Sequence, residues 1–310
     1  MLSLDDGLLL QLLLGIIALQ AIFSLSFRLK VKGVTEHGTH KADVAAYNLV
    51  VFLVNSTCAY EGAKYFLDGT AGALDTNHIS RLYATSPEFN FLGTLTAAYE
   101  VYNTLAVILV SDYRTFAFVG HHATTLVLAL FGFAPSLLHY YGFFFFGIVQ
   151  ISSAPLALAE VCTILDATSL HAASMGVFAL SFLVVRSLIW PLVSLRFWRD
   201  TMAAMQAGER SLGPLTIYLA ANVFLTGLQV VWTRQVVRGL LDALGLGTGG
   251  KAVAKKKTTA AAPTKRAAVT PTRVMRSSTP KRASTPKRVS PPAAKRTASP
   301  ATKRASKKKA

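Results

Sequence analysis

Long apolar stretches alternate with short polar connectors along the first three quarters of the chain. Each stretch holds about twenty residues, the length of helix that crosses the hydrocarbon core of a bilayer, and most are apolar on every side. The seven stretches are Gly7–Phe27, Val44–Leu67, Phe89–Val110, Thr115–Phe133, Leu137–Leu158, Ala172–Leu195 and Leu215–Val237. Because a chain in lipid must satisfy its backbone internally, the pattern predicts an all-α, polytopic membrane protein with about seven transmembrane helices.

The charges that flank the first stretch predict its orientation. Asp5 and Asp6 precede it, whereas Arg28, Lys30 and Lys32 follow it directly. An acidic leader does not suit a cleaved signal peptide, and cytosolic flanks carry the excess of Lys and Arg. We therefore expect an uncleaved anchor with a lumenal N-terminus, and seven spans then place the C-terminus in the cytosol.

The positive charge of the chain lies almost entirely at its C-terminal end. The net charge is +17, and 19 of the 32 Lys and Arg residues lie between Lys251 and Ala310, where there is no Asp or Glu. The first 250 residues hold the other 13 together with all 15 acidic residues, a net charge of −2. A segment of Lys, Arg, Ala, Ser, Thr and Pro buries too little apolar area to fold. Residues 243–310 are therefore predicted to be a disordered basic tail.

Three interpretations of this tail stay open. It is a solvated segment, or it attaches to anionic lipid of the cytosolic leaflet, or it binds nucleic acid through phosphate contacts. The third rests on Thr-Pro-Lys-Arg repeats at 279–282 and 285–288, which resemble linker-histone tails. In addition, Lys307 and Lys308 stand fourth and third from the terminus and resemble a dilysine retrieval signal. This resemblance implies coat proteins as partners and residence in the endoplasmic reticulum membrane, with the nuclear envelope as the alternative.

Two adjacent histidines, His121 and His122, lie inside the fourth apolar stretch. Ionisable residues are costly in a bilayer and mark functional sites there. Neighbouring helical residues point about 100° apart, so one imidazole is expected to face a cavity and the other to bond a neighbouring helix. This geometry argues against a shared metal ion. The two cysteines, Cys58 and Cys162, form no cluster of zinc-site spacing, so neither a metal nor a cofactor is expected.

A permanent charge lies in the sixth stretch at Arg186. A guanidinium stays protonated, so it needs a carboxylate, a phosphate or a water-lined cavity around it. Together with the histidines it predicts a cavity inside the bundle with a polar end. Three other polar residues of the spans, Asn103, Asn222 and Gln229, are instead expected to join helices by hydrogen bonds.

Four segments of the chain resemble the TLC-domain family, which includes the ceramide synthases and the translocating-chain-associated membrane proteins. They are VGHHATTLVLALFGF (119–133), VQISSAPLALAEV (149–161), FLVVRSLIWPL (182–192) and LQVVWTRQVVRGLL (228–241). The resemblance implies a six-helix barrel around a lipid-accessible cavity over residues 37–242, preceded by an anchor and loop at 1–36. On this resemblance, His121 and His122 are expected to contact a lipid's polar group. The other polar residues of the spans that are candidates for the same lipid site are Thr125, Glu100, Gln150 and Arg186.

The chain departs from the ceramide synthases at one point. Those enzymes carry a His-Asp pair after the double histidine, whereas here FFFFGIVQISSAPLALAEV (143–161) has no such pair and no acidic residue before Glu160. We therefore expect a protein of lipid binding and lipid homeostasis in the endoplasmic reticulum that is not a ceramide synthase. Two alternatives stay open. One is an acyltransferase of sphingolipid or phospholipid metabolism with His121 or His122 as general base, and the other is a tether at the inner nuclear membrane through the tail.

Overall fold

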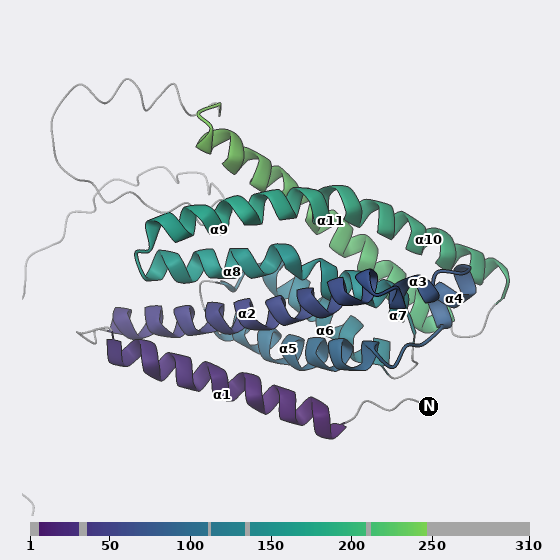
Figure 1. Cartoon of the computed structure of the whole chain (residues 1–310), viewed down its shortest axis with the longest axis horizontal. Coiled ribbons are helices and arrows are strands. Elements are labelled where there is room, and N and C mark those ends of the chain that lie inside the picture. The colour runs from purple at the N-terminus through teal and green to yellow at the C-terminus, as the bar shows by residue number, and fades with distance from the viewer. Residues whose placement is uncertain (1–5, 31–35, 111–112, 134–136, 209–211, 247–310) are drawn as a thin grey trace, which may run out of the picture. The chain divides into compact units, whose positions relative to one another are not determined.

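The computed structural model describes residues 6–30, 36–110, 113–133, 137–208 and 212–246, and among these residues it contains helices and no strand. The helices are, in chain order, α1 (Asp6–Lys30), α2 (Glu36–Leu67), α3 (Thr70–Ala73), α4 (His78–Tyr83), α5 (Phe89–Leu109), α6 (Phe116–Phe133), α7 (His139–Gly142), η2 (Phe143–Ile148), α8 (Gln150–Ile164), α9 (Thr168–Ser181), η3 (Phe182–Ile189), α10 (Trp190–Gln206) and α11 (Leu212–Ala243) (Figure 1). Each predicted apolar stretch corresponds to one helix or to one continuous run of helices. The all-helical fold is confirmed, while the basic tail with Lys307 and Lys308 lies outside the described residues.

Five helical segments are long and apolar enough to cross a membrane: Gly7–Leu29, His40–Leu67, His139–Ile164, Thr168–Gln206 and Gly213–Ala243. The apolar part of α6, Phe116–Phe131, is shorter. Helix α5 has 21 residues and carries buried polar side chains, among them Glu100 and Asn103, along a face that other helices cover. The chain is therefore a multi-pass membrane protein, and the count of seven spans stays a prediction.

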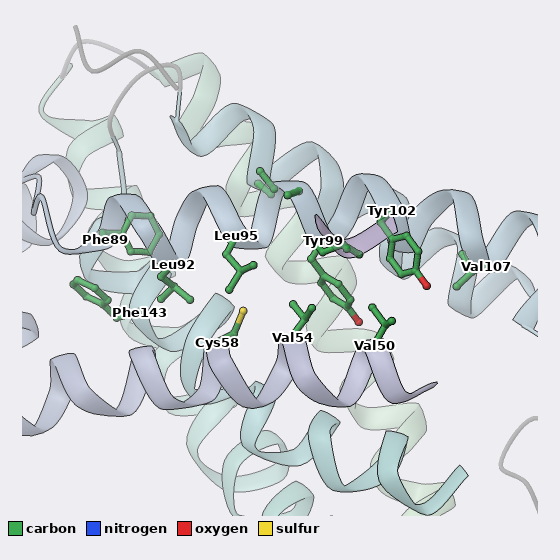
Figure 2. Packing of buried hydrophobic residues seen from close by; sticks show 14 of the residues in the cluster. Val50, Val54, Cys58, Phe89, Leu92, Leu95, Tyr99, Tyr102, Val107 and Phe143 are labelled. Atoms are coloured by element: carbon green, nitrogen blue, oxygen red, sulfur yellow. The ribbon is translucent and has the colours of Figure 1, made fainter. Parts of the chain in front are cut away.

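Helix α5 packs against α1, α2 and α6 through its buried face. Val54 and Cys58 of α2 point toward Leu95 and Tyr99 of α5 in the buried cluster between the two helices (Figure 2). Around this core the outer helix faces keep large apolar side chains exposed, for example Leu14, Leu105, Leu188 and Leu192. Such faces suit helices that are surrounded by lipid rather than by water.

Two glycines let the backbones of α2 and η2 touch. A Cβ atom added at Gly147 would lie 2.5 Å from the Cα of Gly62, and one added at Gly62 would lie 2.6 Å from the Cα of Gly147. Both positions are buried, so neither backbone has room to move away. Small residues at a crossing of membrane helices allow this close approach.

We expect Gly147→Ala to lower the apparent Tm in detergent by about 5 °C, since overpacking a tight contact costs roughly 1–3 kcal/mol. The matched control is Gly176→Ala in α9, where an added Cβ meets nothing within 4 Å. That control should keep or raise the Tm because alanine is the better helix former. Equal Tm values for the two variants would contradict the close contact.

The connector between α2 and α5 has a structure that the hydrophobic pattern did not predict. It forms the short helices α3 and α4, and the side chain of Asn77 accepts a hydrogen bond of 2.9 Å from the backbone N–H of Ser80 at the start of α4. This is the bond of a helix N-cap. Helix α4 then packs on α10, so the connector is tied to a helix that follows it by more than a hundred residues.

Candidate functional site

A cavity lies among α5, α6, α11 and the two segments that contain η2 and η3. Its empty space, the open mouth included, is about 840 Å³, of which only about 60 Å³ is wide enough for the centre of a water molecule. Most of its wall is apolar or aromatic, with Leu128, Phe145, Phe146, Trp190 and Leu225 among the lining residues. A narrow, mostly apolar space with a few polar groups on its wall is typical of a site for a hydrophobic ligand.

Five of the six residues predicted from the sequence lie on the wall of this cavity: Glu100, His121, Thr125, Gln150 and Arg186. The sixth, His122, is buried beside Glu100 and does not line the cavity. Helices α5, α6, α8 and η3 supply the five residues, so the tertiary structure gathers polar groups from distant parts of the chain. Contact of these residues with a lipid stays a prediction.

The two histidines point to different surroundings, as their positions on one helix require. His121 faces the cavity, and its ring meets those of Trp232 and His122 edge to face, with centroids 5.2 Å and 4.8 Å away. Its Nδ1 is buried and has no hydrogen-bond partner among the described residues. The imidazole is thus held by ring contacts while one of its nitrogens keeps its hydrogen-bonding capacity.

His122 belongs to a buried polar network between α2, α5 and α6. With its Nδ1 protonated it donates to Oε2 of Glu100 over 3.1 Å, and Nδ2 of Asn103 lies 3.0 Å from the same nitrogen. Asn103 in turn accepts from the hydroxyl of Tyr47 over 2.5 Å and donates to that of Tyr99 over 3.0 Å. Asn103 therefore joins helices as the sequence suggested, and His122 orients the carboxylate of Glu100 at the cavity wall.

Arg186 is buried, with 7% of its surface exposed, and it is held by a serine pair on α8. Its Nε donates to Oγ of Ser152 over 2.7 Å, and its Nη2 donates to Oγ of Ser153 over 2.8 Å and to the carbonyl oxygen of Val149 over 3.3 Å. All three acceptors are neutral. Among the described residues no carboxylate lies within ion-pairing distance of this guanidinium.

Sequence reasoning noted the Ser152–Ser153 stretch only as a feature of the family and missed its role. Two π-helical segments bring it into place, because η3 carries Arg186 and η2 ends next to Val149. A π-helical turn inserts an extra residue into an α-helix and is frequent at functional sites. The hydroxyls of Ser152 and Ser153 could have been predicted as partners of Arg186 only if α8 and η3 had been known to be neighbours.

The other two residues expected to join helices behave differently from each other. Asn222 accepts a hydrogen bond of 2.8 Å from the indole nitrogen of Trp198 on α10, and it also lines the cavity. Gln229 is buried, and neither of its side-chain polar atoms has a hydrogen-bond partner among the described residues. No group of three His, Cys, Asp or Glu side chains that is placed to hold a metal ion occurs within the described part of the chain.

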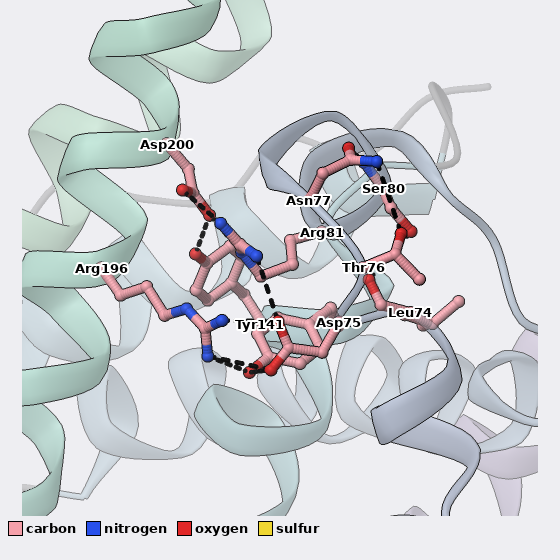
Figure 3. A network of polar contacts seen from close by, with 10 residues as sticks. Leu74, Asp75, Thr76, Asn77, Ser80, Arg81, Tyr141, Arg196 and Asp200 are labelled. Atoms are coloured by element: carbon pink, nitrogen blue, oxygen red, sulfur yellow. Dashed lines mark hydrogen bonds and ion pairs between the residues drawn. The ribbon is translucent and has the colours of Figure 1, made fainter.

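Next to the cavity wall at Tyr141, a group of polar and charged residues forms what we call the Asp200 cluster: Asp75 of the connector between α3 and α4, Arg81 of α4, Tyr141 of α7, and Arg196 and Asp200 of α10 (Figure 3). Arg81 binds both carboxylate oxygens of Asp200 at 2.6 Å and 2.7 Å and reaches Asp75 at 3.1 Å. The hydroxyl of Tyr141, which lines the cavity, donates to Asp200 over 2.5 Å. The bond to Asp200 raises the pKa of the Arg81 guanidinium above its usual value, so this cation stays charged at every pH in ordinary use.

The family model of the TLC domain matches residues 44–238, a range that contains every residue on the cavity wall. No curated protein matches the chain.

Proposed function

The chain belongs to the TLC-domain family of membrane proteins of lipid metabolism or sensing, and on this premise we propose that it binds a membrane lipid in the cavity for lipid homeostasis in the endoplasmic reticulum. The lipid enters with its acyl part between the aromatic and aliphatic side chains, and its polar group meets the polar residues of the wall. Such a role needs no bond to be made or broken by the protein.

The observation that carries this proposal is a set of polar groups on the cavity wall with unused hydrogen-bonding capacity. The Nδ1 of His121 is buried without a hydrogen-bond partner among the described residues. No hydrogen bond joins the side-chain amide of the half-buried Gln150 or the Nη1 of Arg186 to another described residue. Buried polar groups are almost always paired, and an unpaired one costs about 1–3 kcal/mol. Unpaired donors and acceptors around an otherwise apolar space therefore favour a ligand with one polar end and one apolar end.

Filling the cavity should abolish lipid binding. We expect Gln150→Trp, which places an indole in the empty space, to reduce labelling of the purified protein by a photoreactive fatty acid about tenfold or more. The matched control is Ile151→Trp at the next residue of α8, whose side chain is exposed on the outer face. This control should be labelled like the wild type.

The same preparations decide whether the cavity is the binding site. Their elution from a sizing column and their Tm show whether both tryptophan variants fold. Equal labelling of the folded Gln150→Trp and Ile151→Trp variants would show that the fatty acid binds at the outer surface, and the proposal would then be wrong.

A second candidate is an acyltransferase, and the pairing of His122 with Glu100 is the observation that favours it. A carboxylate that orients an imidazole is a familiar arrangement for a general base, and His121 brings a second imidazole to the cavity itself. Incubation of the purified protein with a labelled acyl-CoA and a long-chain base or lysophospholipid tests it. Acyl transfer that is absent from His121→Gln would support the enzyme, and its absence from the wild type would favour the non-enzymatic role.

Residence in the endoplasmic reticulum is part of the proposal and has its own test. We expect that changing Lys307 and Lys308 to serine lets part of the protein reach later compartments, since coat proteins would no longer bind the terminal dilysine. Microscopy of a tagged chain against compartment markers measures this. An unchanged distribution would mean that retention resides in the membrane domain, and that the tail's other proposed partners, anionic lipid or nucleic acid, are the ones to examine.

A further inference from the structure

The hydrogen bonds of Arg186 leave one end of its guanidinium open. A guanidinium has five N–H donors, and here the Nε–H and the two N–H groups of Nη2 bond Ser152, Ser153 and Val149. The two N–H groups of Nη1 have no partner among the described residues, although the side chain lines the cavity. The serine pair therefore fixes the plane of the guanidinium and leaves Nη1 for a ligand.

The charge of Arg186 is also uncompensated. Burial of a cation costs several kcal/mol unless an anion is close to it, and hydroxyl and carbonyl oxygens do not neutralise it. Among the lining residues the carboxyl and imidazole groups are those of Glu100 and His121, and Glu100 is bonded to His122. The polar end of the cavity consequently has a fixed positive charge that nothing described in the chain neutralises.

We propose that Arg186 is an anion site, which takes the carboxylate or phosphate of a lipid whose acyl part lies against the apolar wall of the cavity. Planar donors in a fixed orientation suit the paired oxygens of both groups. Ser152 and Ser153 are then positioning residues, which hold the guanidinium through its other nitrogens. This inference rests on the proposed function and names the chemistry of the ligand.

The experiment compares three probes that share the oleyl chain: oleate, oleyl phosphate and oleyl alcohol. Their binding to the full chain in detergent is measured by native mass spectrometry. We expect at least one of the two anions to bind roughly tenfold more tightly than the neutral alcohol, as a charge-assisted contact in a buried site implies. The stronger of the two anions then identifies the carboxylate or the phosphate as the preferred group.

Variants assign this preference to a residue. Arg186→Gln should remove the preference for anions and leave oleyl alcohol within about twofold of its wild-type affinity. The matched control is Arg199→Gln, an exposed arginine of α10, which should bind all three probes like the wild type. If Arg186→Gln does not fold, the double change Ser152→Ala and Ser153→Ala serves instead, because it keeps the charge and frees the guanidinium; it should weaken the anions severalfold.

The results distinguish a failure of lipid binding in the cavity from a failure of the anion site at Arg186. If no probe binds to the wild type, lipid binding in the cavity is wrong, and the anion site with it. If the three probes bind equally, or if Arg186→Gln keeps the preference for anions, the cavity still binds lipid but the anion site is wrong.

Discussion

Replacing Asp200 by asparagine is expected to lower the free energy of unfolding by about 3–5 kcal/mol, because it leaves a partly buried cation without its main partner. The side chain of Arg81 is 12% exposed and that of Asp200 is 7% exposed, and the two meet through two hydrogen bonds. Asp75 cannot replace the lost carboxylate, since it is shared with Arg196. The apparent Tm in detergent should fall by roughly 10 °C.

A double-mutant cycle tests whether the pair itself is responsible. Arg81→Gln combined with Asp200→Asn should cost clearly less than the sum of the single changes, because the second change removes the unpaired charge that the first one leaves. Asp242→Asn, on an exposed turn of α11, is the control and should change the free energy of unfolding by less than about 0.5 kcal/mol. Additive effects would mean that the Asp200 cluster contributes no coupled ion pair.

The second large effect is expected at the two histidines, and it should differ between them. His121→Gln should leave the Tm within a few degrees of wild type and yet abolish function, because the flexible amide loses the ring contacts with Trp232 and His122 that hold the imidazole at the cavity wall. His122→Gln should instead lower stability by about 1–3 kcal/mol, since it disturbs the bonded network around Glu100 and Asn103.

Function is measured here as the lipid composition of cells that lack the protein and are complemented with each variant. Thermal unfolding of the purified variants gives stability, and expression levels are matched before lipids are compared. One outcome would contradict this prediction. If loss of function follows loss of stability at both positions, the histidines only hold the bundle together, and the imidazole of His121 at the cavity wall has no separate role.

The helices and the division of roles between the histidines were predictable from the sequence alone. Helix length in a membrane follows from bilayer thickness, so apolar runs locate the helices, and α1 and α6 begin and end within a few residues of the predicted stretches. The angle between adjacent helical residues is a local property. From this angle alone the sequence predicted that only one of His121 and His122 faces a cavity. The short helices α3 and α4 were missed, because a polar connector with N-cap chemistry has no membrane-length pattern.

The tertiary structure alone decided which polar groups meet. Asp200 pairs with Arg81 across 119 positions of the sequence. Arg186 of η3 bonds Ser152 and Ser153 of α8 across 34 and 33 positions. Sequence periodicity specifies the faces of each helix but not which face of another helix lies opposite, because that depends on how all the helices pack at once. For the same reason the sequence predicted that Arg186 needs a partner. Only the packed bundle shows that this buried guanidinium lines the cavity and is held by neutral oxygens through Nε and Nη2.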